Sequence, residues 1–166
     1  MRQNPVSGTI PTPRSEERCD LDMKDFNFYY PVEVRYGDLD PQGHVNNAKY
    51  LTYFEHARSY YRRQLGLFHE EQSFLDIGVI LADIHITFQA PIQWGRKLKV
   101  GVRTAEMRNK SMIVEQCIVD SDTGEVYATG EIVQVAYDYR QGKAILIPDD
   151  WREKISSFEK ISGHSR

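Results

Sequence analysis

Cysteine is scarce in this sequence. Its 166 residues include two cysteines, Cys19 in a polar N-terminal segment and Cys117 in an alternating apolar run. Neither has a CxxC partner or the spacing of a metal site, which argues against a disulfide framework, a zinc ribbon and a redox motif. We therefore expect Cys117 to be a buried thiol, and we expect no metal and no other cofactor.

Long apolar runs are lacking as well. No segment approaches the roughly 18 consecutive apolar residues of a membrane-spanning helix. The first 25 residues also lack the apolar core of about 7 to 15 residues that marks a secretory signal. We therefore expect a cytoplasmic protein that has no membrane partner.

Neither sign of charge is in large excess. The chain has 21 basic and 24 acidic residues, a net charge of −3 at pH 7, and no block of like charge. Such a chain attracts nucleic acid weakly over long range, and no DNA-binding helical module is recognisable, so nucleic acid is not an expected partner. What is present is the composition of a globular protein, 40% hydrophobic and 27% charged, with a length that fits one domain.

Composition divides the chain into three parts. Residues 1–25 mix prolines, serines and charges without periodicity, which predicts a flexible arm. Residues 26–147 carry the periodic patterns of the folded domain. Residues 148–166 begin with a proline and two aspartates, which favour the start of a short helix over about 151–158, followed by a tail.

The folded part reads as one long helix and several strands. From Tyr50 onward apolar residues recur at helical spacing, with Arg58 among the polar positions, Asn46 or Asn47 as a cap and Gly66 at the end. Period-two alternation predicts strands over 30–36, 78–90, 98–107, 112–120 and 126–139, with 144–146 pairing after a turn. Short links between the later strands indicate antiparallel neighbours. The helix must bury its apolar stripe on one sheet face, which predicts an α+β fold with the sheet wrapped around the helix.

Polar groups crowd the segment between the first strand and the helix. Residues 35–58 read RYGDLDPQGHVNNAKYLTYFEHAR, with Asp38, Asp40, Gln42, His44, Asn46 and Asn47 in one loop and helix start. The loop brings these groups to the helix N-terminus, where unpaired amides carry about half a positive charge. A carboxylate there can act as nucleophile or general base while amides hold an oxyanion.

This segment resembles the signature of the hotdog-fold acyl-CoA thioesterases of the 4-hydroxybenzoyl-CoA thioesterase type. Its DLD, HVNN and KY elements are also similar to those of the plant acyl-ACP thioesterases. The order of elements from about Phe28 to Leu146 follows the same family. The resemblance implies a hotdog fold, in which a curved antiparallel sheet wraps one long central helix, and it implies thioester hydrolysis.

The resemblance also implies roles for single residues. Asp40 matches the aspartate that attacks the thioester carbonyl or activates water, and the amide near Asn47 matches the oxyanion donor. His44 matches a histidine with a catalytic part in the acyl-ACP enzymes, although the bacterial enzymes often carry an apolar residue there. Gln42 matches an asparagine of the plant enzymes and is one carbon longer. Tyr50, in the first helical turn, is a candidate for substrate contact.

Each candidate has a structural alternative. Asp40 precedes Pro41, which is a common turn arrangement, and Asp38 can cap the loop by bonding nearby amides, although it is also the rival catalytic carboxylate. Asn47 can be a helix cap and Tyr50 a core residue.

Outside the loop, a basic turn is the main candidate for binding the substrate. Arg108, Lys110 and Ser111 lie where family members often contact CoA, and a solvated hairpin turn is the alternative. Glu55 falls off the apolar stripe, so we expect it to be exposed. His85 alternates with apolar residues in a strand, which favours an interior histidine outside the catalytic set.

Together these patterns predict a thioesterase that cleaves an acyl-CoA, or an acyl carrier protein thioester, and that assembles as a homodimer or homotetramer. The acyl group is not predicted, because several strands and a neighbouring subunit would build its pocket. Two alternatives stay open. One is a hotdog enoyl-CoA hydratase or dehydratase using Asp40 and His44 as an acid–base pair, and the other is a non-catalytic acyl-CoA-binding sensor.

Overall fold

The computed structural model describes residues 25–68, 73 and 77–161. Its elements in chain order are β1 (Phe28–Glu33), the short 3-10 helix η2 (Tyr36–Asp38), α1 (Asn47–Gln64), β2 (Ile77–Phe88), β3 (Lys97–Met107), β4 (Ser111–Asp120), β5 (Val126–Asp138), β6 (Lys143–Ala144) and α2 (Asp149–Glu159). Of the expected flexible arm, residues 1–24 lie outside the described residues, as does Cys19. Among the helices that are described, none has the length and apolar character needed to span a membrane.

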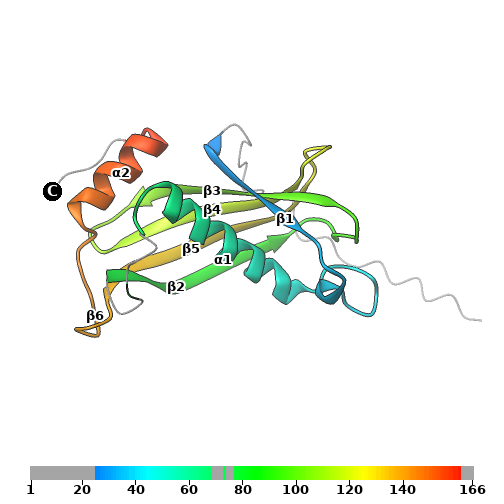
Figure 1. The fold of residues 1–166 in the computed structure, drawn as a ribbon, viewed down its shortest axis with the longest axis horizontal. Helices are drawn as coiled ribbons and strands as arrows, with labels where there is room; N and C mark the ends of the chain where they lie inside the picture. The colour runs from blue at the N-terminus through cyan, green and yellow to red at the C-terminus, as the bar shows by residue number, and fades with distance from the viewer. Residues whose placement is uncertain (1–24, 69–72, 74–76, 162–166) are drawn as a thin grey trace, which may run out of the picture.

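The strands form one antiparallel sheet in the order β1-β3-β4-β5-β2, with β6 paired to β5. Figure 1 shows α1 lying across one face of this sheet. The loop after β1 and the start of α1 lie at one end of the sheet, and α2 and β6 lie at the opposite end (Figure 1). This arrangement confirms the predicted α+β class and the single long helix on a curved antiparallel sheet of the hotdog fold.

Helix α1 is positioned by a cap and by a buried stripe. The Asn46 side chain accepts a hydrogen bond from the Ala48 amide at 3.0 Å, as predicted for an N-terminal cap. The buried face includes Phe54, which is fully buried over Gly130 of β5. A Cβ at Gly130 would lie 2.9 Å from the Phe54 ring, so the helix approaches the sheet closely at this point. Glu55 is exposed, as predicted.

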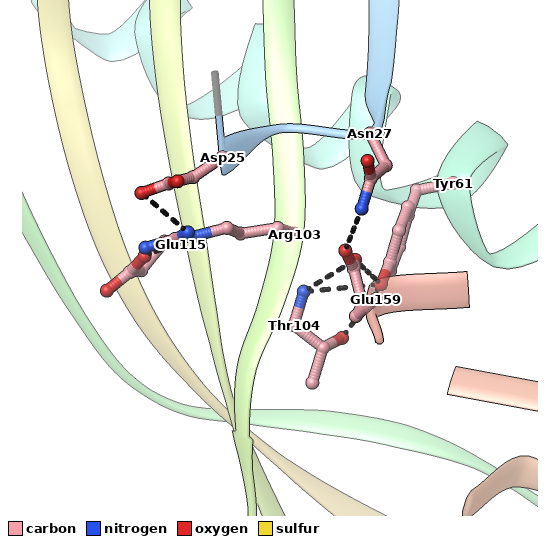
Figure 2. A network of polar contacts seen from close by, with 7 residues as sticks. All are labelled: Asp25, Asn27, Tyr61, Arg103, Thr104, Glu115 and Glu159. Carbon is pink, nitrogen blue, oxygen red and sulfur yellow. Dashed lines mark hydrogen bonds and ion pairs between the residues drawn. The ribbon is translucent and has the colours of Figure 1, made fainter. Parts of the chain in front are cut away.

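Helix α2 covers the sheet end where α1 stops. Trp151 is buried against Phe68, and the Lys154 ammonium donates to the Gly66 carbonyl at 2.9 Å. Glu159 accepts hydrogen bonds from the Tyr61 hydroxyl and, at 3.0 Å, from the Thr104 amide (Figure 2). Burial, followed by the nearby Glu159 charge, raises the pKa of Tyr61. This network joins α2 to both α1 and β3.

Three details of the sequence prediction were wrong. The first strand ends at Glu33, and Tyr36 lies in η2 with its side chain 78% exposed, because the Asp38 amide bonds the Arg35 carbonyl and turns the chain. His85 is exposed, because β2 is an edge strand and alternation places this residue on its outer face. Arg58, expected among the polar positions, is 6% exposed. Cys117 is buried, as predicted.

Candidate functional site

A groove opens at the N-terminal end of α1. It has a volume of about 510 Å³ and is lined on one side by Asp40, His44, Val45, Asn47 and Tyr50. The other side is residues 88–91, at the end of β2, where the Phe88 ring meets the Tyr50 ring edge-on at 4.9 Å between centroids. The groove therefore brings together four of the residues that the sequence singled out.

The loop closes around the carboxylate of Asp40. One oxygen, Oδ1, accepts hydrogen bonds from the Gln42 amide at 2.9 Å and from the His44 amide at 3.1 Å. The Asp40 amide donates to the His44 carbonyl at 2.7 Å, and Gly43 completes the turn with a φ of +80°, which favours glycine. Within the described residues, no hydrogen bond or ion pair reaches Oδ2. These hydrogen bonds close residues 40–44 into a loop, which we call the Asp40 ring. The ring fixes the carboxylate and leaves one of its oxygens for another molecule.

The start of α1 leaves one amide without a partner among the described residues, at a position that lines the same groove as Asp40. The Ala48 amide bonds the Asn46 side chain, and the Lys49 amide bonds the Asn46 carbonyl at 2.8 Å. The Asn47 amide has no partner among the described residues, and Asn47 lines the groove. First-turn amides lack intrahelical acceptors and carry the positive end of the helix dipole. This amide can therefore donate a hydrogen bond to an oxyanion.

Tyr50 joins the groove to the core. Its side chain is 3% exposed, and burial raises the pKa of its hydroxyl. The backbone of Ile92 opposes this shift, and the charge of Asp40 adds to it. The hydroxyl therefore keeps its proton at neutral pH and can donate a hydrogen bond in the groove.

Four predicted substrate-binding side chains lie outside this groove. Gln42 is exposed and contributes its backbone amide to the Asp40 ring. Strand β3 begins at the groove end of the sheet and spans eleven residues, roughly 35 Å at about 3.3 Å per residue. The basic turn of Arg108, Lys110 and Ser111 follows β3, so it lies at the opposite end of the sheet from the groove.

The basic turn makes its contacts at its own end of the sheet. Arg108 pairs with Glu106 at 2.9 Å, and Lys110 donates to the Ala144 carbonyl at 3.4 Å. The Ser111 carbonyl accepts from the Arg108 amide at 2.7 Å. Within one chain these residues do not reach the groove, so their contact with CoA stays a prediction that needs a neighbouring chain.

Sequence reasoning missed the far wall of the groove. The sequence patterns did not place residues 88–91 near the loop. The Val45 amide bonds the Ile92 carbonyl at 2.8 Å, and His44 forms an isolated bridge with Gln93. The signal that could have found this wall is Pro91, which ends the strand predicted over 78–90, because a proline cannot donate to a strand ladder. Across the described part of the chain, no cluster of histidine, cysteine or acidic residues is arranged to hold a metal.

The second aspartate of the loop faces the other way. Asp38 is 7% exposed and lines a cavity of about 420 Å³ between β1 and α1. Its carboxylate accepts from the Arg35 amide at 3.0 Å and from the Tyr53 hydroxyl at 2.9 Å, and it lies 3.4 Å from the Lys49 ammonium. Burial alone would raise the pKa of Asp38, but these three partners hold it below its usual value. Asp38 therefore caps the loop, as its structural interpretation predicted.

Known proteins share both the sequence and the fold. Residues 34–155 match the family model of the thioesterase-like superfamily. The long-chain acyl-CoA thioesterase FadM of Escherichia coli K12 is 29% identical over 129 residues, 78% of this chain and 97% of FadM. The acyl-CoA thioesterase YbgC of Haemophilus influenzae is 30% identical over 131 residues, 77% of this chain and 93% of YbgC.

A solved structure extends the match to three dimensions. A thioesterase from Thermus thermophilus, complexed with coenzyme A and zinc, is 32% identical with a TM-score of 0.72, and the match covers 84% of this chain and 100% of that one. The family match spans well over half of the present sequence and includes the whole loop and α1. The chain therefore belongs to the thioesterase-like superfamily.

Proposed function

We propose that this thioester hydrolase acts on an acyl-CoA, releasing a free carboxylic acid and CoA, with Asp40 as its catalytic carboxylate. The observation that carries the proposal is the pairing of the unused Asp40 Oδ2 with the unused Asn47 amide along one groove. Hydrolysis of a thioester needs both groups, because one attacks the carbonyl carbon or activates water and the other stabilises the charge that forms on the carbonyl oxygen.

The chemistry can follow either of two routes. As a nucleophile, Asp40 Oδ2 bonds to the carbonyl carbon, the carbon–sulfur bond breaks, CoA leaves as the thiolate, and water then hydrolyses the mixed anhydride. As a general base, Asp40 takes a proton from a water that attacks the same carbon, after which the carbon–sulfur bond breaks and CoA leaves as the thiolate. In both routes the Asn47 amide, at the positive end of α1, holds the oxyanion.

The remaining groove residues would place the substrate. The protonated Tyr50 hydroxyl can donate to the thioester or to Asp40, and His44 can orient water beside the ring that its own backbone helps to form. Gln42 has its side chain at the loop surface, where it can contact the incoming CoA. Phe88 offers an apolar wall to the acyl group.

A second copy of the chain would complete the site. The groove lies beside the edge strand β2, where Leu81 and Phe88 are 48% and 51% exposed. Edge strands with exposed apolar residues favour pairing with another strand. We propose a homodimer or homotetramer in which a neighbour covers this edge and brings its Arg108 to Ser111 turn toward CoA. Light scattering coupled to gel filtration gives the oligomeric state directly.

The test of the activity is thiol release from short, medium, long and aromatic acyl-CoAs. Asp40→Asn should lower kcat at least about 100-fold, because the amide neither attacks nor takes a proton. Asp122→Asn is the control, since Asp122 forms an exposed ion pair with Lys97. Full activity in Asp40→Asn would contradict the assignment of the carboxylate. If the wild-type protein releases no thiol, hydration of an enoyl-CoA and CoA binding without turnover are measured on the same preparation.

A further inference from the structure

We propose that Asp38, together with Tyr53 and Lys49, forms a clamp that positions Asp40 and the first amides of α1 for catalysis. This inference rests on the proposed function, and it assigns Asp38 as a positioning residue that does not touch the substrate. The two aspartates are two residues apart in the chain, yet they line different cavities, Asp40 in the groove beside β2 and Asp38 in the cavity beside β1.

The clamp is a set of contacts on one buried carboxylate. Tyr53 reaches Asp38 Oδ2 from the second turn of α1, and Arg35 reaches the same oxygen through its backbone amide. Lys49 pairs with Oδ1 from the first turn of α1. The carboxylate therefore ties the chain just after β1 to two successive turns of the helix, and replacing it by an amide removes the charge and one of its two acceptor oxygens.

The backbone of Asp38 carries this restraint into the site. The Asn46 amide donates to the Asp38 carbonyl at 2.8 Å, and Leu39 forms a bridge with Val45. These contacts close the base of the loop whose tip is the Asp40 ring. Because Asn46 is also the residue before the helix, the same contact fixes the Asn47 amide relative to Asp40.

A loop held at its base in this way affects the reaction more than binding. On the proposed function, the Asp40 oxygen and the Asn47 amide must meet the same carbonyl group in the transition state, whereas most of the substrate's contacts would be made by its acyl and CoA portions. A displacement of about 1 Å in such a pair can lower the rate by about 100-fold. Loss of the clamp should therefore lower kcat and leave KM nearly unchanged.

The chain provides a matched control in a second buried aspartate. Asp120 is 2% exposed and accepts from the Asp122 amide at 2.9 Å, from the Thr123 amide at 3.0 Å and from the Tyr127 hydroxyl at 3.2 Å. The Arg96 guanidinium lies 3.6 Å from it, just as the Lys49 ammonium lies 3.4 Å from Asp38. Asp120 holds the turn between β4 and β5 and lines neither cavity, so Asp120→Asn reproduces the loss of a buried carboxylate outside the lining of the groove.

The experiment compares kcat and KM for Asp38→Asn, Tyr53→Phe and Asp120→Asn at equal folded fraction. We expect Asp38→Asn to lower kcat by about 10-fold to 100-fold, with KM within about twofold, and Tyr53→Phe to lower it less because two partners of Asp38 remain. Asp120→Asn should keep kcat within about twofold. In an Asp40→Asn background, Asp38→Asn should add little, because the residue that it positions is gone.

Amide spectra make the test independent of turnover. In 15N NMR spectra the signals of Gln42 and His44, whose amides bond Asp40, should move in Asp38→Asn and stay in place in Asp120→Asn. An unchanged kcat with unchanged signals in Asp38→Asn overturns the inference, as does an equal loss of kcat in Asp120→Asn. If no variant or wild type releases thiol while these signals still move, the clamp stands and the proposed function fails.

Discussion

Arg58 donates a hydrogen bond to Gln116 at 2.7 Å inside the core, where Arg58 is 6% exposed and Gln116 is fully buried. Gln116 in turn donates to the Phe54 carbonyl at 2.9 Å, so one amide side chain links β4 to two positions of α1. Among the described residues Arg58 Nε has no hydrogen-bond partner. Burial, followed by the charge of Arg62, lowers the pKa of Arg58 to about 10. The arginine therefore depends on Gln116 for its main buried contact.

The dependence predicts a large effect of a nearly isosteric change. Gln116→Leu should lower the free energy of unfolding by about 3 kcal/mol, because it leaves a buried guanidinium without an acceptor. Adding Arg58→Met should restore part of this loss, since an apolar pair of similar volume needs no partner. Urea unfolding followed by circular dichroism measures both. A single variant within about 0.5 kcal/mol of wild type would contradict the prediction.

The Glu159 network predicts how α2 is held. Glu159→Ala should weaken docking of α2 by about 1 to 3 kcal/mol, because it removes the α2 carboxylate that accepts from both the Thr104 amide and the Tyr61 hydroxyl. Trp151 reports this directly, since it is 5% exposed in α2 whereas Trp94 is 63% exposed. In a Trp94→Phe background, the Trp151 emission should shift to the red at a lower urea concentration in Glu159→Ala. If the Trp151 emission shifts at the same urea concentration with and without Glu159→Ala, the network does not hold α2.

The contact of Phe54 with Gly130 predicts a steric cost. Gly130→Ala should destabilise the fold by about 1 to 3 kcal/mol, because its Cβ would lie 2.9 Å from a fully buried ring. Gly37→Ala is the control, since a Cβ there meets no atom within 4 Å. Thermal unfolding midpoints of the two variants decide the matter. Equal midpoints would mean that the sheet moves away from the helix at little cost.

The Cys117 thiol predicts a pH dependence. Burial raises the pKa of Cys117 from 9.0 to about 11, so the folded thiol keeps its proton after the unfolded one has lost it. The associated stability is complete below about pH 9 and is lost as the pH rises toward about 11, by up to roughly 2 to 3 kcal/mol.

The measurement is urea unfolding of wild type and Cys117→Ala at a series of pH values. Burial, followed by the nearby Cys117, raises the pKa of Tyr29 from 10.0 to about 12, so the slopes of the two proteins are compared between about pH 9 and 10, before Tyr29 loses its proton. The wild-type free energy of unfolding should fall more steeply above pH 9. Parallel slopes would place the thiol in contact with water.

Local patterns made most of the fold predictable. The spacing of Tyr50 and Phe54, the cap at Asn46 and the alternation in the later strands depend on neighbours in sequence, so they could be read without a structure. Charge was a poor guide where packing overrode it, as at Arg58, which the helical pattern placed at a polar position. The interior position predicted for His85 was wrong for a different reason, because alternation does not say which face of an edge strand is covered.

Part of the candidate groove was predictable from the sequence. One contiguous motif contains four of the residues that line the groove, namely Asp40, His44, Asn47 and Tyr50. The wall at residues 88–91 is about forty residues further along the chain, and its position depends on the pairing of β2 with β5. The clamp around Asp38 likewise depends on which way a short loop turns its two carboxylates. Neither follows from the spacing of residue types.

The sheet order has a consequence for the sequence of events in folding. The central strands β3, β4 and β5 follow one another through short turns, whereas β1 pairs with β3 across a long separation, as in Phe28 with Val102. Closing a long loop costs more entropy than closing a turn, so the meander should form first and the edges should join it later. Hydrogen exchange should accordingly be slowest in β4. The groove, built from a loop after one edge and the end of the other, is then among the last parts to acquire its shape and among the first to lose it.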